Sequence, residues 1–131
     1  MVYLDTDFPV ALLRGDKDAR ERGDEMDRED VKKATTPINA FELFLGAYLS
    51  ERRDANLAVV RALLYNLELL EFDLRSCEEA GLIAAGLRSR GEPIGVRDSM
   101  IAGIASRFEE TVLTRNIEHF SRVKELNVEK W

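Results

Sequence analysis

The stretch that decides the fold is MVYLDTDFPVALL, residues 1–13, in which an apolar run ends on acids and a second apolar run follows. Val2–Leu4 predicts a short buried strand. Phe8–Leu13 predicts an apolar helix, with Asp7 as its N-cap. Asp5 therefore stands at the carboxyl end of the first strand, where that strand turns into a helix.

The same alternation of strand and helix continues along the chain. Further strands are predicted at Thr35–Ile38, Leu69–Phe72, Thr111–Thr114 and Leu126–Val128, and helices at Asp54–Asn66, Arg75–Arg90, Asp98–Phe108 and within Arg115–Val123. Strands separated by helices imply parallel pairing with helices on both faces of the sheet. We expect one α/β domain over residues 1–131, built as three layers around a parallel sheet of four or five strands.

Two segments carry a more specific prediction. Phe41, Phe44, Leu45, Tyr48 and Leu49 recur at helical spacing, which predicts a helix that packs this stripe into the core. The segment 14–33 is dense in charges of both signs, which indicates a solvated helix or a partly mobile loop.

Composition narrows the class of function. The chain has 131 residues, a net charge of −6, one cysteine and one histidine. A single cysteine forms no internal disulfide, which favours a reducing cytoplasm, and no apolar stretch or signal peptide points to a membrane. Zinc and Cys–His chemistry are poorly supported. The acidic balance disfavours general nucleic-acid binding, although it does not exclude a nuclease whose catalytic acids contribute to the charge.

Three acids stand where apolar patterns break: Asp5 after the first strand, Glu42 early in a helix, and Asp98 at the opening of another. In an open parallel sheet such positions converge on one crevice, and a divalent cation would relieve the repulsion between the acids. Each acid also has a structural alternative. Asp5 suits a strand-to-helix turn, Glu42 could close a capping box with Asn39, and Asp98 suits a first helical turn.

Four segments, residues 3–7, 38–47, 93–102 and 113–120, resemble the successive motifs of PIN-domain ribonucleases. The likeness is closest to the VapC-like toxins of type II toxin–antitoxin pairs. The motifs occur in the order of that family and span nearly the whole chain. The resemblance implies a PIN-like fold and a metal-dependent endoribonuclease.

The resemblance also implies roles for individual residues. Asp5, Glu42 and Asp98 would bind Mg²⁺ or Mn²⁺ and activate water for cleavage of RNA. The fourth metal-site position of the family falls on Asn116, which carries no negative charge, so the number of metal ions stays open. Asp7 could add a charge, although a capping role is the stronger prediction for it.

Residues beside these acids could assist. Thr6 and Thr114 could position water or metal, although ordinary packing at the strand end is the preferred interpretation of Thr114. Arg97 and Arg115 could contact RNA phosphate or remain solvated charges. For His119 a structural role is favoured over acid–base catalysis.

Two rival functions remain open at this stage. Asp5-Thr6-Asp7 also resembles the nucleophile motif of haloacid-dehalogenase-type phosphatases, with Asp5 as the nucleophile, but Lys124 is a poor match for the lysine that such enzymes need. The other rival is a catalytically weak PIN fold that mainly binds a partner. The PIN resemblance implies an antitoxin as that partner and a homodimer with contacts from residues 54–66 and 75–90.

Overall fold

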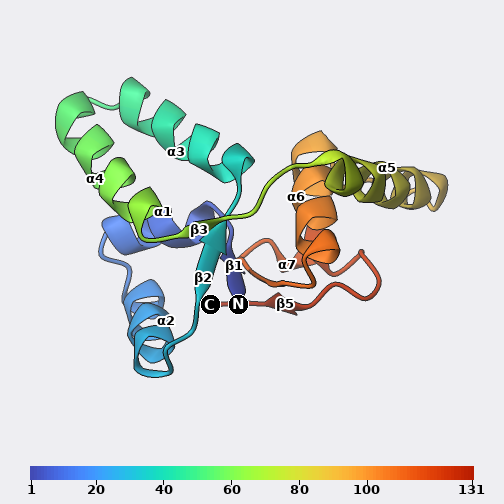
Figure 1. Ribbon diagram of the computed structural model, residues 1–131, viewed down its shortest axis with the longest axis horizontal. Coiled ribbons are helices and arrows are strands. Elements are labelled where there is room, and N and C mark those ends of the chain that lie inside the picture. Colours follow the sequence, from blue (N-terminus) through green and yellow to red (C-terminus); the bar gives the residue numbers. More distant parts are fainter.

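The computed structural model describes residues 1–131 and contains one five-stranded sheet in the order β3-β2-β1-β4-β5. Its strands are β1 (Val2–Leu4), β2 (Lys33–Thr35), β3 (Glu68–Leu69), β4 (Thr111–Leu113) and β5 (Val128–Glu129). All four strand pairs are parallel, and β1 lies at the centre (Figure 1). The predicted α/β fold with a parallel sheet is confirmed.

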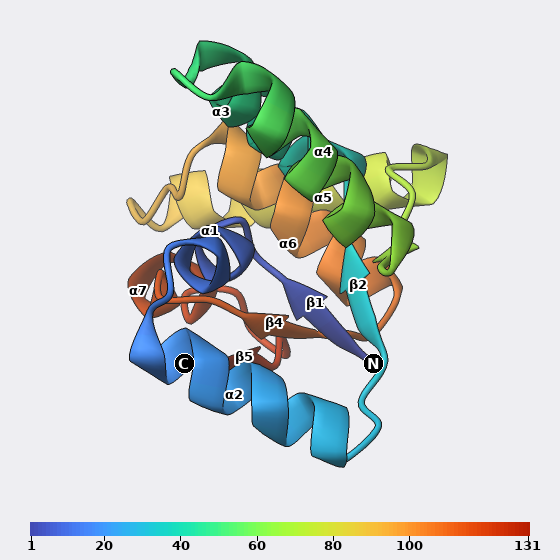
Figure 2. The ribbon, with the colours of Figure 1, turned by 90° about the vertical axis from the view of Figure 1, so that its left-hand side faces the viewer.

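Seven helices surround the sheet: α1 (Asp7–Leu13), α2 (Lys17–Arg28), α3 (Pro37–Leu49), α4 (Arg53–Tyr65), α5 (Leu74–Ser89), α6 (Val96–Arg107) and α7 (Ile117–Phe120). In Figure 1 the α3–α4 hairpin lies at one end of the long axis and α5 at the other. Figure 2 shows α2 below the sheet and the α3–α4 hairpin above it. No helix combines the length and the apolar character needed to cross a membrane.

The alternation of side chains along the central strands divides the core. Tyr3 and Val112 pack on one face of the sheet with α5 and α6, whereas Leu4 and Leu113 pack on the other face with α1 and α2. A third, smaller cluster joins α3 to α4. Because both faces of β1 are covered, its residues are apolar throughout, as the opening stretch predicted.

Two predicted boundaries were wrong, the N-cap of the first helix and the strand at 35–38. The N-cap of α1 is Thr6 instead of Asp7, and Asp7 is the first helical residue. Strand β2 ends at Thr35, because Thr36 caps α3 through the backbone amide of Asn39 and Pro37 occupies the first turn. Proline is well suited to that position, since its missing N–H has no partner in a first turn.

The segment 14–33 is largely helical. It forms α2, whose N-cap Asp16 accepts a hydrogen bond from the Ala19 amide, and then enters β2 at Lys33. Ala19 and Met26 are the buried residues of α2, so most of its charged side chains face solvent. The prediction of a solvated helix is therefore confirmed over the loop alternative.

The apolar stripe predicted for α3 is largely outside the core. Phe41 is 64% exposed and Leu49 79% exposed, whereas Leu43 and Ala47 are buried. The error has a simple cause: the buried cluster of α3 is formed with α4, and outside this hairpin only Val10 of α1 packs against it, so a helix that is apolar on most sides keeps much of its apolar surface in solvent.

The contact between α5 and α6 is closer than side chains normally permit. A Cβ atom built at Gly103 would lie 2.6 Å from both the Cβ and the backbone N of Ala80. Only glycine fits at that crossing, which brings the two helix backbones together.

A small aromatic cluster lies beside the sheet on the α1 side. The Trp131 ring meets Phe8 edge to face, with centroids 5.3 Å apart. The Arg115 guanidinium lies over the Trp131 ring, 3.7 Å from its centroid. This cation–π contact fixes the segment that follows β4.

Candidate active site

The predicted acids meet at the carboxyl ends of β1 and β4. Asp5 directly follows β1, Asp98 lies in the first turn of α6, and Glu42 lies in the second turn of α3. Asp5 is 3% exposed and Asp98 7% exposed, whereas Glu42 is half-buried. Elements that are far apart in the sequence thus place three carboxylates in one pocket.

Asp5 forms the buried floor of this pocket and is held through both oxygens. Its Oδ1 accepts hydrogen bonds from the Thr6 amide at 2.9 Å and from Asn39 Nδ2 at 3.2 Å. Its Oδ2 accepts from the Thr114 hydroxyl at 2.8 Å. Because a buried charge is costly unless its lone pairs are used, this network is what allows a carboxylate at the end of the central strand. Thr114 is thus a polar support and not only strand-end packing.

Asn39 is a residue of the pocket that was not predicted as one. Its side chain is fully buried, and its oxygen accepts from the hydroxyls of Tyr3 and Thr36. Its amide nitrogen donates to Asp5 and, at 2.8 Å, to the Thr6 hydroxyl. A sequence signal was present, because Asn39 lies one helical turn before Glu42 on the same face of α3.

Glu42 does not close a capping box with Asn39. Its Oε1 accepts from the Thr6 hydroxyl at 2.8 Å, and both of its oxygens accept from the Arg97 guanidinium at 2.7 and 3.0 Å. Burial by itself raises the pKa of Glu42, but the hydrogen bonds from Arg97 and Thr6 outweigh it, and the pKa lies below its usual value.

Asp98 is held from the opposite side by the segment that follows β4. Its Oδ2 accepts a hydrogen bond from Asn116 Nδ2 at 3.0 Å and lies 2.7 Å from His119 Nδ1. Its Oδ1 accepts from Arg97 Nη1 at 2.6 Å. Asn116 therefore stands beside the acids as predicted, and His119 orients Asp98 through a direct contact.

One cation joins the three acids. Arg97 Nη2 lies 2.8 Å from Asp5 Oδ1 and 2.7 Å from Glu42 Oε1, while Nη1 reaches Asp98. Burial alone would lower the pKa of Arg97, yet the hydrogen bonds and charges of these acids raise it above its usual value. The predicted alternative of a solvated Arg97 does not describe this arrangement.

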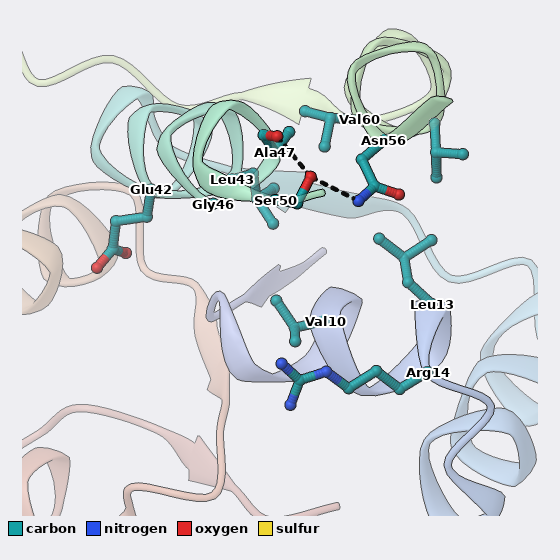
Figure 3. A pocket seen from close by; sticks show the side chains of 11 residues that line it. Val10, Leu13, Arg14, Glu42, Leu43, Gly46, Ala47, Ser50, Asn56 and Val60 are labelled. Carbon is teal, nitrogen blue, oxygen red and sulfur yellow. Dashed lines mark hydrogen bonds between the residues drawn. The ribbon is translucent and has the colours of Figure 1, made fainter. Parts of the chain in front are cut away.

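A groove lies next to the acids, between α1 and the α3–α4 hairpin. It encloses about 390 Å³, and Glu42 stands at one end of it (Figure 3). Most of its lining is apolar and includes Val10, Leu13, Leu43, Val59 and Val60. The acidic pocket and an apolar groove thus share one edge of the molecule.

The PIN-domain family model matches residues 2–126. This match covers nearly the whole chain and includes every residue of the pocket. The chain belongs to the PIN-domain family. Within it the relatives are VapC proteins: the tRNA(fMet)-specific endonuclease VapC of Salmonella typhimurium is 37% identical over 72% of this chain and 71% of its own. The protein of the same name from Shigella flexneri is 30% identical over 98% of this chain and 96% of its own.

Solved VapC structures share the fold over the full length. The DNA-bound VapBC complex of Salmonella typhimurium contains a chain that matches with a TM-score of 0.87 and 31% identity, covering 100% of this chain and 99% of that one. VapBC2 of Rickettsia felis, bound to a promoter DNA fragment, gives a TM-score of 0.88 at 27% identity with the same coverage. The PIN fold of this VapC-like chain is therefore established by sequence and by structure.

The donor set of this VapC-like pocket suits a hard divalent cation in its chemistry, since three carboxylates converge on a position that already attracts positive charge. The present arrangement is not a ready-made site, because no three acid, histidine or cysteine side chains are grouped closely enough to hold a metal ion. The Arg97 guanidinium lies among the acids and takes up the oxygens that a metal would need.

Two further predicted residues lie at the edge of the VapC-like pocket. Asp7 accepts hydrogen bonds from the Arg115 amide at 2.8 Å and from Thr114, and burial raises its pKa above the usual value. The Arg115 side chain turns away from the acids, toward Trp131 and Asp16. Its backbone serves the pocket, whereas its guanidinium lies on the rim.

Proposed function

We propose that this VapC-like chain is a metal-dependent endoribonuclease and the toxin of a toxin–antitoxin pair. The observation that carries the proposal is that Asp5, Glu42 and Asp98, from three separate elements, converge on the guanidinium of Arg97. Membership of the PIN-domain family supports it, as do the endonuclease and ribonuclease names of the relatives.

The three acids would hold Mg²⁺ or Mn²⁺ together. A cation bound there supplies Lewis acidity that lowers the pKa of water and offsets charge on the scissile phosphate. Thr114 and Asn39 fix the orientation of Asp5 by hydrogen bonds to its two carboxylate oxygens. The oxygen that now contacts Arg97, Oδ1, would face the metal ion. Asn116 and His119 do the same for Asp98.

We propose that the pocket binds one metal ion instead of two. Asn116 donates its amide to Asp98 and adds no negative charge. The only further acid beside the pocket is Asp7, whose raised pKa and backbone contact with Arg115 make it a poor ligand. Three carboxylates suffice to neutralise a single divalent ion.

RNA is the proposed substrate. The net charge of −6 leaves the bound cation, Arg97 in the pocket and Arg115 on its rim as the attraction for phosphate, so a short contact is favoured over a long electrostatic track. Two relatives carry the name tRNA(fMet)-specific endonuclease, which makes the initiator tRNA the first RNA to test.

The partner proposed for the groove is an antitoxin with an apolar segment and a basic residue. The groove is lined by apolar side chains and ends at Glu42, so an apolar helix seated there would bring a basic residue to the acids. The pocket already accepts a guanidinium from Arg97, which shows that its shape and charge suit one. Such a residue would compete with Mg²⁺.

A homodimer is also proposed, on family resemblance. The predicted contacts lie on α4 and α5, which stand at opposite ends of the long axis (Figure 1). In an isologous dimer residue i of one subunit contacts residue j of the other and the reverse, so α4 of one subunit would meet α5 of its partner. Sedimentation at micromolar concentration tests the dimer.

Cleavage of RNA by the purified chain tests the enzyme directly. The chain is incubated with total RNA, and separately with initiator and elongator methionine tRNA, in Mg²⁺, Mn²⁺ or EDTA, and the RNA ends are sequenced. Discrete new ends that require metal and disappear with Asp5→Asn are expected. Contamination is controlled by Asp54→Asn, which makes the same change on an exposed residue of α4.

The alternative is a PIN fold that only binds its partner. Asn116 in place of an acid is the observation that favours it. Binding of a co-expressed antitoxin without any metal-dependent cleavage would support this alternative. The phosphatase alternative loses its support, because Lys124 is exposed and the chain belongs to the PIN-domain family.

A further inference from the structure

Every acid proposed as a metal ligand already shares one internal cation. Arg97 uses Nε, Nη1 and Nη2 to contact Glu42, Asp98 and Asp5. These contacts engage Oδ1 of both aspartates and both oxygens of Glu42. A metal ion in the same place would need those same oxygens.

The charges favour a competition between Arg97 and a metal ion. Three carboxylates outweigh one guanidinium, so the pocket keeps an excess of negative charge that a divalent cation can satisfy. Arg97 and the metal would repel each other at contact distance. With the guanidinium between them, the acids as they stand do not form a group of three that could hold a metal ion.

The position of Arg97 in the fold allows its guanidinium to move from the pocket into solvent. Arg97 is the second residue of α6, and a positive charge at a helix N-terminus is disfavoured by the helix dipole, so the guanidinium is held there by the acids and by a longer contact with the Thr6 hydroxyl. Its side chain is 34% exposed, and the preceding residue, Val96, is 73% exposed. Rotation about the side-chain bonds can therefore carry the guanidinium into solvent without movement of α6.

We propose that Arg97 is an internal counter-cation, which partly neutralises the acids in the metal-free protein and leaves the pocket when the divalent cation binds. This inference rests on the proposed function, in which Asp5, Glu42 and Asp98 bind that cation. Displacement of Arg97 costs its ion pairs, so the native chain binds metal more weakly than a chain without the guanidinium. By linkage, metal binding weakens the interaction between the Arg97 guanidinium and the acids by the same factor.

Metal affinity measured by calorimetry tests the competition. Mn²⁺ is titrated into the native chain, Arg97→Gln, and Arg61→Gln, an exposed arginine of α4 that forms no ion pair and matches the loss of charge. Arg97→Gln is expected to bind Mn²⁺ about tenfold more tightly. Arg61→Gln is expected to bind as the native chain does.

Thermal unfolding supplies a readout that does not depend on activity. In EDTA, Arg97→Gln is expected to melt several degrees below the native chain, because its acids are unneutralised. At saturating Mn²⁺ the difference is expected to close or reverse. Arg97→Lys, which keeps the charge but offers no planar fork, is expected to fall between the two.

Nuclear magnetic resonance observes the displacement in the native chain, whether or not the variants fold. The Nε–H signal of Arg97 is expected to be protected in EDTA and to move to the position of solvated arginines as Mg²⁺ is added. A signal that stays protected at saturating Mg²⁺ overturns the inference.

The outcomes separate the inference from the proposed function. Equal Mn²⁺ affinity in the native chain and Arg97→Gln, with binding abolished by Asp98→Asn, overturns the role of Arg97 and leaves the metal site standing. Absence of Mn²⁺ binding in both chains overturns the metal site and the inference together. Tighter binding by Arg97→Gln supports both.

Discussion

The α3–α4 hairpin and the α5–α6 hairpin of this PIN domain bury their apolar residues to different extents. Helix α3 is rich in large apolar side chains, yet Phe41, Leu45 and Leu49 are largely exposed. Helix α6 has fewer large side chains, yet seven of its twelve residues are buried. The difference lies in neighbours: α6 packs against the sheet and α5, whereas the buried apolar side chains of α3 pack mainly against α4, beside the open groove. The number of apolar residues in a helix therefore does not tell how many are buried. That depends on whether other elements of the chain pack over them.

The largest expected difference between the two hairpins is in RNA cleavage, which should depend on an acid of α6 and not on an acid of α4. Asp98→Asn on α6 removes one of the three proposed ligands and should reduce metal-dependent RNA cleavage by about 10²–10³-fold, since loss of metal stabilisation is worth several kcal/mol. Asp54→Asn on α4 makes the same change outside the pocket and should cleave normally. Initial rates on a defined RNA provide the measurement, with circular dichroism to confirm the fold. Comparable rates for the two variants would contradict the assignment.

The next effect separates the hairpins by packing. Gly103→Ala places a methyl group 2.6 Å from Ala80 and should destabilise the protein by about 3 kcal/mol, because α5 must move away from α6. Gly46→Ala on α3 meets nothing within 4 Å and should stabilise by about 0.5–1 kcal/mol through helix propensity. Urea unfolding measures both. Equal stabilities would show that the close contact is easily relieved.

The exposed apolar surface provides a third contrast. Val59→Gln on α4 alters the groove and should weaken antitoxin binding by about tenfold, or roughly 1.4 kcal/mol, since apolar contacts of that size are typical at interfaces. Leu82→Gln on α5 changes a residue that is 69% exposed and far from the groove, and should leave the affinity unchanged. Both variants should stay within about 0.5 kcal/mol of native stability. A weaker complex with Leu82→Gln instead would move the partner to the other hairpin.

The smallest expected effect is the pH dependence of Glu42. Its pKa is lowered below the usual 4.5. A lowered carboxylate pKa contributes stability above the unfolded value, and that contribution is lost as the pH falls through the folded value. Because Glu42 is partly solvated, Glu42→Gln should cost only about 0.5 kcal/mol at neutral pH.

The change should also flatten the stability curve below pH 4.5. Asp73, the cap of α5, has a lowered pKa for a local reason, the hydrogen bond from the Ser76 amide, and shifts the curve in the same direction. Unfolding free energies measured across the acid range distinguish the two groups. An unchanged acid limb in Glu42→Gln would show that Arg97 does not stabilise the ionised form.

The order of elements could be predicted from sequence because strand and helix patterns are local. The boundary between β2 and α3 could not, since Thr35-Thr36-Pro37-Ile38 suits a strand as well as a cap followed by a first turn. The exposed face of α3 was missed because burial depends on a neighbour that the periodicity does not specify. Both errors arise where a local pattern admits two tertiary settings.

The acids of the pocket were identified by position and resemblance, but their supports were not. Asn39 resembles a capping residue in sequence, and its side chain forms four hydrogen bonds with four other residues, three of them more than 30 residues away in the sequence. Arg97 contacts Asp5 across 92 residues of sequence, and no local pattern predicts such a contact. The acidic residues indicated a cation site from the sequence, whereas only the structure shows that the cation among them is Arg97.

The cation–π contact of Trp131 gives the protein an optical property. Trp131 is the only tryptophan in the chain, so all of its indole emission comes from one ring. That ring lies under Arg115, which directly follows Thr114, a support of Asp5. A phosphate that draws the guanidinium off the indole would change the intensity and wavelength of this emission. The unlabelled protein thus contains a native fluorophore at the rim of its pocket, suited to following the arrival of RNA in real time.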